Sequence, residues 1–342
     1  MNRELRQLEP TSPLWSTFVA SHPSATAFHH PAWTGLLAEC YGYRSFALVL
    51  LDDAGQVAAG VPVLEVGRPF GGRRWISLPF TDYCPLLASD DLTETFLDCL
   101  INEMNSKRLV FELRGDLPTN DKVWVHSDAV RHSLTLSSGP DPVAAQFTTM
   151  HRRNIRRGER AGVRIEMGHS VAAVDVFYRL HVLTRKRLGA PVQPYRFFRV
   201  LTDLLLERGL GFVLLAHLGE TPVAAAIFLT WNGVLIYKYG ASDMNFWECR
   251  PNNLLFWAAI KWACENGYHT LDFGRTDLGN QGLRDFKRGW GAREEPLVYS
   301  VIGGHEPQAV RGTTARALRA LIRYSPSWVC RAIGELFYRY AA

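Results

Sequence analysis

Two short stretches near the end of the sequence carry residues whose types and spacing suit chemistry on a bound ligand. LDFGRTD contains Asp272, Arg275 and Asp277, and GLRDFKRGWG contains Lys287. The first stretch directly follows the last strand of a predicted strand-helix-strand unit, and open α/β sheets bind ligands at that edge. A carboxylate there could accept or position a proton, or it could pair with Arg275 and only shape the loop.

Lys287 follows Phe286 and precedes a glycine-containing turn, which predicts an ammonium group held in a partly closed loop. In such a loop it could face a developing negative charge or a phosphate. The alternative is an exposed surface lysine, which is the usual environment of this residue type.

A third stretch, residues 151–164, carries six arginines against one acid. A helix would align Arg153, Arg157, Arg160 and Arg164 on one face at spacings of three and four. Such a face repels itself unless acids pair with it, so it predicts a polyanionic partner, either tRNA phosphates or a lipid diphosphate headgroup. A solvated helix that pairs with acids from elsewhere is the alternative.

The chain as a whole has the composition of a folded globular protein. It has 342 residues, of which 47% are hydrophobic and 21% charged, with a net charge of +5. This length is enough for two domains. The six cysteines show no metal-ligand spacing, which predicts no metal site and a reducing compartment. The start of the sequence lacks an apolar signal segment, so we expect a cytoplasmic protein.

The elements that must position these residues occur twice. ALVLLDDAGQVAAGVPVL and FVLLAHLGETPVAAAIFLTW both read as β-hairpins, and they align when Leu48 is matched to Phe212. A helical segment precedes each hairpin, and a strand, a loop, a helix and a strand follow it. This order predicts an α/β (α+β) protein in which each half is a mixed sheet flanked by helices.

Turn-forming residues in SSGPDP place the junction of the two halves near residues 138–150. The predicted domains are therefore 1–145 and 146–304, followed by a helical tail at 305–342. From Val310 onward the tail has six arginines and one acid, and its last helix has an apolar face that includes Trp328, Leu336, Phe337 and Tyr340. Residues 310–342 could either pack on the second domain or lie on an anionic membrane surface.

The ordered motifs HRRNIRRGERAGV, LDFGRTD and GLRDFKRGWG, set in a duplicated layout, resemble the Fem family. That family consists of nonribosomal aminoacyl transferases built from two tandem GNAT-like domains. The resemblance extends over about residues 10 to 300, in line with the two domains expected from length. It implies a reaction in which an amine of a cell-envelope precursor attacks the ester carbonyl of an aminoacyl-tRNA to form an amide.

The resemblance also implies roles for individual residues. Lys287 matches a Phe-Lys pair that stabilises the transition state, and Arg187 matches an arginine that contacts the phosphates of the acceptor. The remaining positions are expected along the acceptor groove or its opposing wall; they are Tyr237, Tyr239, Asp243 and Trp33. Tyr237 and Tyr239 would share one face of a regular strand. Core packing for the tyrosines and simple exposure for Arg187 are the alternatives.

Two departures from family patterns leave both substrates open. The segment between Gly240 and Gly267 has no glycine, so a glycine-rich coenzyme A cradle is not expected, which favours an aminoacyl-tRNA as donor and leaves an unusual thioester as the alternative. Gly35 stands where relatives that act on nucleotide-linked peptidoglycan precursors have a lysine, so a polysaccharide amine or a lipid-linked intermediate could be the acceptor. An acyl-CoA-dependent N-acyltransferase and a noncatalytic envelope-assembly scaffold are the competing hypotheses.

Overall fold

The computed structural model describes residues 4–67, 72–304 and 313–338. Contacts divide the chain into two compact units. Of the described residues, unit one holds 4–67, 72–130 and 296–304, and unit two holds 131–295 and 313–338. Strands β6 (Val123–Thr135) and β12 (Arg293–Ile302) therefore each begin in one unit and end in the other.

Unit one is a mixed sheet with helices on both faces. Its strands lie in the order β1-β2-β3-β4-β5-β12. The elements confined to this unit are β1 (Arg6–Leu8), α1 (Pro13–Ser21), α2 (Pro31–Tyr41), β2 (Arg44–Leu51), β3 (Val57–Gly67), β4 (Arg73–Ile76), α3 (Asp90–Lys107) and β5 (Val110–Leu113). The β2–β3 turn closes because Asp52 Oδ1 accepts from Gln56 N and Gly55 takes a φ of 77°.

The two faces of the unit-one sheet are covered by different helices. Apolar side chains of β2 and β3 such as Leu48 and Val61 share a buried cluster with Phe96 and Leu100 of α3. The opposite face of β3 carries Gly60, where an added Cβ would lie 2.9 Å from the Trp15 ring of α1. Glycine is needed there because the indole packs directly on the strand backbone.

Unit two repeats this architecture. Its strands lie in the order β6-β11-β10-β9-β8-β7. Its elements after β6 are α4 (Pro140–Ala145), α5 (Thr149–Arg160), β7 (Val163–Gly168), α6 (Val171–Leu188), α7 (Tyr195–Leu204), the 3-10 turn η1 (Leu206–Arg208), β8 (Gly211–Leu218), β9 (Thr221–Trp231), β10 (Val234–Ser242), the 3-10 turn η2 (Met244–Cys249), α8 (Pro251–Glu265), β11 (Thr270–Asp277), α9 (Gln281–Arg288), α10 (Thr313–Tyr324) and α11 (Ser327–Phe337).

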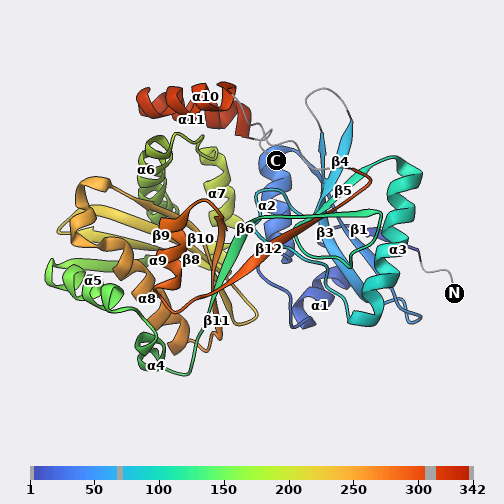
Figure 1. The fold of residues 1–342 in the computed structure, drawn as a ribbon, viewed down its shortest axis with the longest axis horizontal. Helices are drawn as coiled ribbons and strands as arrows, with labels where there is room; N and C mark the ends of the chain where they lie inside the picture. Colours follow the sequence, from blue (N-terminus) through green and yellow to red (C-terminus); the bar gives the residue numbers. More distant parts are fainter. Residues whose placement is uncertain (1–3, 68–71, 305–312, 339–342) are drawn as a thin grey trace. The chain divides into compact units, whose positions relative to one another are not determined.

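Helices α5 and α8 cover one face of the unit-two sheet, and α6 and α7 cover the other (Figure 1). On the first face, Phe212, Phe228 and Leu235 share a buried cluster with Phe256 and Ile260 of α8. On the second face, the Tyr239 ring lies 5.6 Å from the ring of Phe198 in α7. The sheet is thus buried on both sides, as its strongly apolar strands require.

The duplicated layout predicted from the sequence is confirmed in both units. Each expected hairpin is antiparallel, β2 with β3 and β8 with β9. Each is followed by a strand, a helix and a parallel strand, with β4 pairing β5 in unit one and β10 pairing β11 in unit two. The α/β fold with mixed sheets and a C-terminal pair of helices follows the prediction.

The C-terminal helices α10 and α11 pack on α6 of unit two. Two contacts fix α11 to the turn that follows α6. Cys330 Sγ donates to Ala190 O at 3.5 Å, and Gly334 is so close to the Val192 carbonyl that a Cβ there would overlap it. Tyr340, which the sequence placed on the apolar face of the last helix, lies outside the described residues. Within the described ranges, every helix falls short of the length and apolar character that a bilayer crossing needs.

Candidate active site

Strands β10 and β11 pair only over their first residues and then diverge. The last registered pair is Ile236 with Asp272, although β10 continues to Ser242 and β11 to Asp277. Backbone groups beyond this pair need other partners, since buried N–H and C=O groups are almost always satisfied. Five of the residues singled out from the sequence belong to these two strands; they are Tyr237, Tyr239, Asp272, Arg275 and Asp277.

A bulge in β10 separates the two candidate tyrosines. The register with β9 shifts between Tyr237 and Tyr239, so the expected shared face is wrong. Tyr237 points to the α8 side, where its ring lies 4.7 Å from Phe256, and burial raises its pKa to about 12. Tyr239 lies on the other side among the rings of α6 and α7, including His181. At most one of them can border a single groove.

Strand β11 bends at Gly274, whose φ is 68°. Asp272 is buried and stabilises the bend, because its Oδ1 accepts from Gly274 N at 2.7 Å. Its Oδ2 lies 3.5 Å from Nε of Arg131 in β6. Asp272 is therefore a structural acceptor and one half of an ion pair.

Lys287 is buried, with 2% of its surface exposed, and the surface alternative is therefore excluded. Its Nζ donates to Gly274 O at 2.9 Å and to Arg275 O at 3.2 Å. Successive carbonyls of a regular strand point to opposite edges, and the bend at Gly274 is what lets one ammonium reach both. Lys287 belongs to helix α9, which corrects the expectation of a loop.

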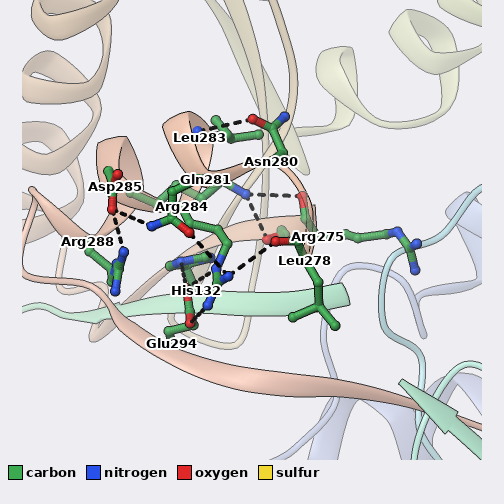
Figure 2. Close-up of polar contacts among 12 residues, drawn as sticks. His132, Arg275, Leu278, Asn280, Gln281, Leu283, Arg284, Asp285, Arg288 and Glu294 are labelled. Atoms are coloured by element: carbon green, nitrogen blue, oxygen red, sulfur yellow. Dashed lines mark hydrogen bonds and ion pairs between the residues drawn. The ribbon is translucent and has the colours of Figure 1, made fainter. Parts of the chain in front are cut away.

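Helix α9 is fixed by a charged network that joins Arg284 to β12 and β6 (Figure 2). Arg284 binds Glu294 with both ends of its guanidinium, Nε to Oε2 at 3.0 Å and Nη2 to Oε1 at 2.7 Å. His132 of β6 donates from Nε2 to the same Oε2 at 3.0 Å. The Arg284 hydrogen bonds lower the pKa of Glu294 to about 2, so this carboxylate is ionised at neutral pH.

His132 is fully buried, and three causes lower its pKa: first its burial, then the nearby charge of Lys287, and last that of Arg288. The imidazole is therefore neutral at physiological pH. With Nε2 donating to Glu294, Nδ1 keeps its lone pair, and this atom has no hydrogen-bond partner among the described residues. A neutral imidazole oriented by a carboxylate is an arrangement suited to accepting a proton.

His151 ties α5 and α8 to the helix that carries Lys287. Its Nε2 donates to Phe286 O at 2.8 Å, and its Nδ1 accepts from Asn253 Nδ2 at 3.2 Å. Its ring stacks on Trp290 at 4.4 Å. Burial lowers the pKa of His151, which keeps Nδ1 available as an acceptor. The carbonyl it holds belongs to the residue directly before Lys287.

The remaining acidic candidates lie at the surface of this region. The Asp277 side chain is 72% exposed and pairs with Arg275, Nη2 to Oδ1 at 2.9 Å. Asp243 caps the 3-10 turn η2 by accepting from Asn245 N at 3.0 Å. The shaping role that the sequence leaves open for Asp277 is what its hydrogen bonds to Arg275 describe.

The candidate phosphate-binding Arg187 lies at the end of α6. Its guanidinium lies 4.5 Å from the centre of the Trp247 ring. Burial and then the nearby charge of Arg323 lower its pKa, and neither arginine has an acidic partner within the described part of the chain. Two neighbouring cations without a counter-ion favour an anion.

The arginine-rich stretch forms α5 as predicted, and Arg153 and Arg157 are exposed on it. The helix ends at Arg160, after which Gly162 takes a φ of 78°. Arg164 therefore belongs to β7 and pairs with Glu220 at 3.4 Å, so its expected place on the helical face is wrong.

Trp33 belongs to the core of unit one. It is fully buried, and its Nε1 donates to Thr81 Oγ1 at 2.8 Å. Its full burial and this hydrogen bond are those of a packed core residue, and the binding role expected from the sequence stays a prediction.

No local sequence pattern predicts the residues that surround Lys287. His132 and Glu294 hydrogen-bond to each other although they are far apart in the chain, and neither belongs to a motif with recognisable spacing. His151 is the first residue of the arginine-rich stretch, and the charge pattern of that stretch does not predict a role for it. Its position three residues after the N-cap Thr148 on the inner side of an amphipathic helix was the available sign.

A model of the acetyltransferase (GNAT) domain family matches residues 134–288, the range that contains this site. Among solved structures, FemX superposes with a TM-score of 0.70 at 15% identity. The superposition covers 87% of this chain and 96% of the FemX chain. Residues 134–288 of this chain therefore belong to the acetyltransferase (GNAT) domain family, and the chain has the fold of FemX.

Two further relatives of this GNAT-fold protein differ in kind. A 97-residue stretch is 32% identical to the lipid II:glycine glycyltransferase of Staphylococcus haemolyticus, and it is 27% of this chain and 21% of that protein. The chain thus aligns with about a fifth of the curated relative. A tandem GNAT protein from the clavulanic acid biosynthesis pathway superposes with a TM-score of 0.53 at 13% identity. The superposition covers 89% of this chain and 100% of the chain of that protein.

Proposed function

We propose that this protein transfers an aminoacyl group from aminoacyl-tRNA to an amine of a cell-envelope precursor and so forms an amide. The observation that carries the proposal is the buried Lys287 ammonium, held where β10 and β11 diverge. A cation in a water-poor site stabilises a developing oxyanion far more than a solvated one does. The Fem relationship supports an ester donor and an amine acceptor.

The reaction requires few groups. The amine nitrogen attacks the carbonyl carbon of the ester, a C–N bond forms, and the carbonyl oxygen becomes an oxyanion. That oxygen takes the place of one of the Lys287 acceptors, Gly274 O or Arg275 O. Collapse of the intermediate breaks the C–O bond and releases the tRNA hydroxyl.

The proton of the attacking amine needs an acceptor, and we assign this role to His132. Its free Nδ1, its neutral state and its orientation by Glu294 support the assignment. The imidazole later returns the proton to the leaving oxygen. Asp272 and Asp277, the positions proposed from the sequence, are less suited because their oxygens are engaged by Gly274 N and Arg275.

Arg187 and the α5 arginines supply positive charge at two other places on unit two. Arg187 would hold a phosphate of the acceptor, and Arg153 and Arg157 would hold the tRNA backbone. The alternative donor, an acyl-CoA, keeps the same Lys287 and His132 chemistry with a thiolate as leaving group. The turn before α8 is formed by Arg250 at a φ of 53° rather than by a glycine, which favours the tRNA donor.

The test is transfer of a labelled amino acid from charged tRNA to an amine acceptor by purified protein. Lys287→Gln removes the charge but keeps a polar N–H donor, and it should lower kcat about 100- to 1000-fold. Arg288→Gln, which removes the neighbouring and more exposed cation, is the matched control and should retain most activity.

Transfer that survives complete ribonuclease digestion of the donor would assign the donor to acyl-CoA. A Lys287→Gln protein with unchanged kcat and an unchanged melting temperature would contradict the oxyanion role.

A further inference from the structure

The outer surface of α10 and α11 is the most apolar exposed region in the described part of the chain. Among the large hydrophobic side chains of the described residues, the four most exposed all lie on these two helices. They are Tyr324 (83%), Trp328 (68%), Leu336 (65%) and Phe337 (59%). Leu321 of α10 is 53% exposed. Soluble surfaces rarely gather such side chains on neighbouring helices without a partner.

This exposure is not the result of a loosely attached helix. Besides the contacts of Cys330 and Gly334, Glu335 accepts from Tyr195 N at 2.9 Å at the start of α7. The Arg331 guanidinium lies 5.4 Å from the centre of the Tyr178 ring. One side of α11 is thus fixed to unit two. Trp328 and Leu336, eight residues apart with Ala332 between them, are 68% and 65% exposed and so are not covered by unit two.

Positive charge borders the apolar surface. Arg319, Arg323 and Arg331 are exposed on the two helices, and the only acid of the tail, Glu335, is engaged with α7. Gly189 at the end of α6 lies against Arg319, which brings α10 next to the candidate phosphate-binding Arg187. Aromatic and aliphatic side chains bordered by arginines are typical of helices that lie in the interface of an anionic bilayer.

We propose that α10 and α11 form a docking surface for an anionic lipid membrane, with Trp328, Leu336 and Phe337 entering the interfacial region and Arg319 and Arg323 contacting lipid phosphates. Tryptophan and tyrosine suit this depth because their rings are apolar while their polar atoms stay hydrated. Docking through this surface places the end of α6, and with it Arg187, close to the headgroup layer. The inference holds for either acyl donor, so its failure would leave the proposed function untouched.

The test is flotation of the full chain with vesicles of phosphatidylcholine and with vesicles that also contain phosphatidylglycerol. Binding should require the anionic lipid. Trp328→Gln with Leu336→Gln should lower the bound-to-free ratio about 10-fold or more, because both side chains leave water on docking. Arg319→Gln with Arg323→Gln should lower it about 5-fold per charge. Melting temperatures should stay unchanged, since all four side chains are exposed.

Met150→Gln with Met167→Gln is the matched control, because both are exposed apolar side chains of unit two that lie in α5 and β7. An equal loss in this control, or no flotation of the unaltered protein with anionic vesicles, overturns the proposal. So does a dimer, seen by sedimentation, that the tail replacements dissociate. A melting shift with inorganic phosphate in the absence of flotation would assign the arginines to a free anion and also overturn it.

Discussion

Burial of a histidine costs little free energy only when the ring stays neutral and its N–H group finds an acceptor. His132 meets this condition through Glu294, which is itself held by Arg284. The carboxylate fixes which ring nitrogen carries the proton and leaves Nδ1 free to accept one. Lys287 adds a second constraint, since its positive charge disfavours a second positive charge on the ring.

The pH dependence of transfer tests this role of His132. Its folded-state pKa is lowered from 6.5, so the neutral and active form persists below pH 6.5 and is lost as the pH falls further. The acid limb of kcat/KM should therefore have its midpoint below 6.5. His132→Gln should lower the rate about 100- to 10,000-fold and abolish this limb. An acid limb that remains unchanged in His132→Gln would place the proton acceptor elsewhere.

The sequence predicted Lys287 from its neighbours but could not predict its surroundings. Its importance follows from a local pattern, a Phe-Lys pair close to a glycine turn. Its burial depends on the bend at Gly274 and on contacts from β6 and α5, which no spacing in the chain encodes. For the two tyrosines of β10 the local pattern itself misleads. Alternation along a strand predicts that they share a face, and this fails where a bulge inserts one residue.

At the scale of elements, the bulge in β10 is stabilised by a close contact between Tyr237 and Gly240. A Cβ added at Gly240 would lie 1.8 Å from the Tyr237 hydroxyl oxygen. The tyrosine thus folds back over its own strand and packs its ring against Phe256 of α8. Glycine at this position lets β10 leave the register of β11 while its bulged segment stays paired with β9.

Gly240→Ala should therefore destabilise the protein by about 1–3 kcal/mol, the usual cost of overpacking a filled interior. Tyr237→Phe removes the oxygen that the new methyl group meets and should restore part of the loss in the double variant. Thermal unfolding of the unaltered protein, the two single variants and the double variant measures the coupling free energy between the two positions. Gly282→Ala in α9, where an added Cβ meets nothing within 4 Å, serves as the control and should be neutral or stabilising. Additive losses without rescue would mean that the hydroxyl is not the obstacle.

At the scale of the whole molecule, unit two carries positive charge on both sides of its sheet. Helix α5 lies on the side of α8, and α10 and α11 lie on the side of α6. Five exposed arginines of α5 have no acidic partner in the described ranges; they are Arg152, Arg153, Arg156, Arg157 and Arg160. One side would thus attract a nucleic acid while the other faces lipid.

The salt dependence of tRNA binding tests the role of α5. If Arg153 and Arg157 each neutralise a phosphate, replacing both with glutamine should reduce the slope of log Kd against log salt by about 1 to 2. Filter binding over a range of salt concentrations gives this slope. Arg179→Gln with Arg208→Gln, two exposed arginines elsewhere in unit two, should leave it unchanged. Equal slopes for the unaltered protein, the Arg153 and Arg157 double variant and the control would mean that the nucleic acid binds elsewhere.

The repeated architecture could be predicted from the sequence, because hairpins and their flanking helices are local patterns. The division of β6 and β12 between the two units could not be predicted from the sequence, because the sheet edge that a strand joins depends on partners far along the chain. A turn-rich segment such as SSGPDP marks where one helix begins and carries no information on which sheet the preceding strand enters.

The division of β12 between the two units has a consequence for synthesis on the ribosome. Strand β5 of unit one pairs with the later part of β12, Leu113 with Ser300. When the ribosome has released residues up to Thr135, β5 still has an open edge, and such edges invite pairing with other chains. All the sheet strands that lie wholly in unit two emerge before Ser300 does. The amino-terminal unit, although it is made first, is therefore the last to complete its sheet, contrary to the usual order of domain folding during translation.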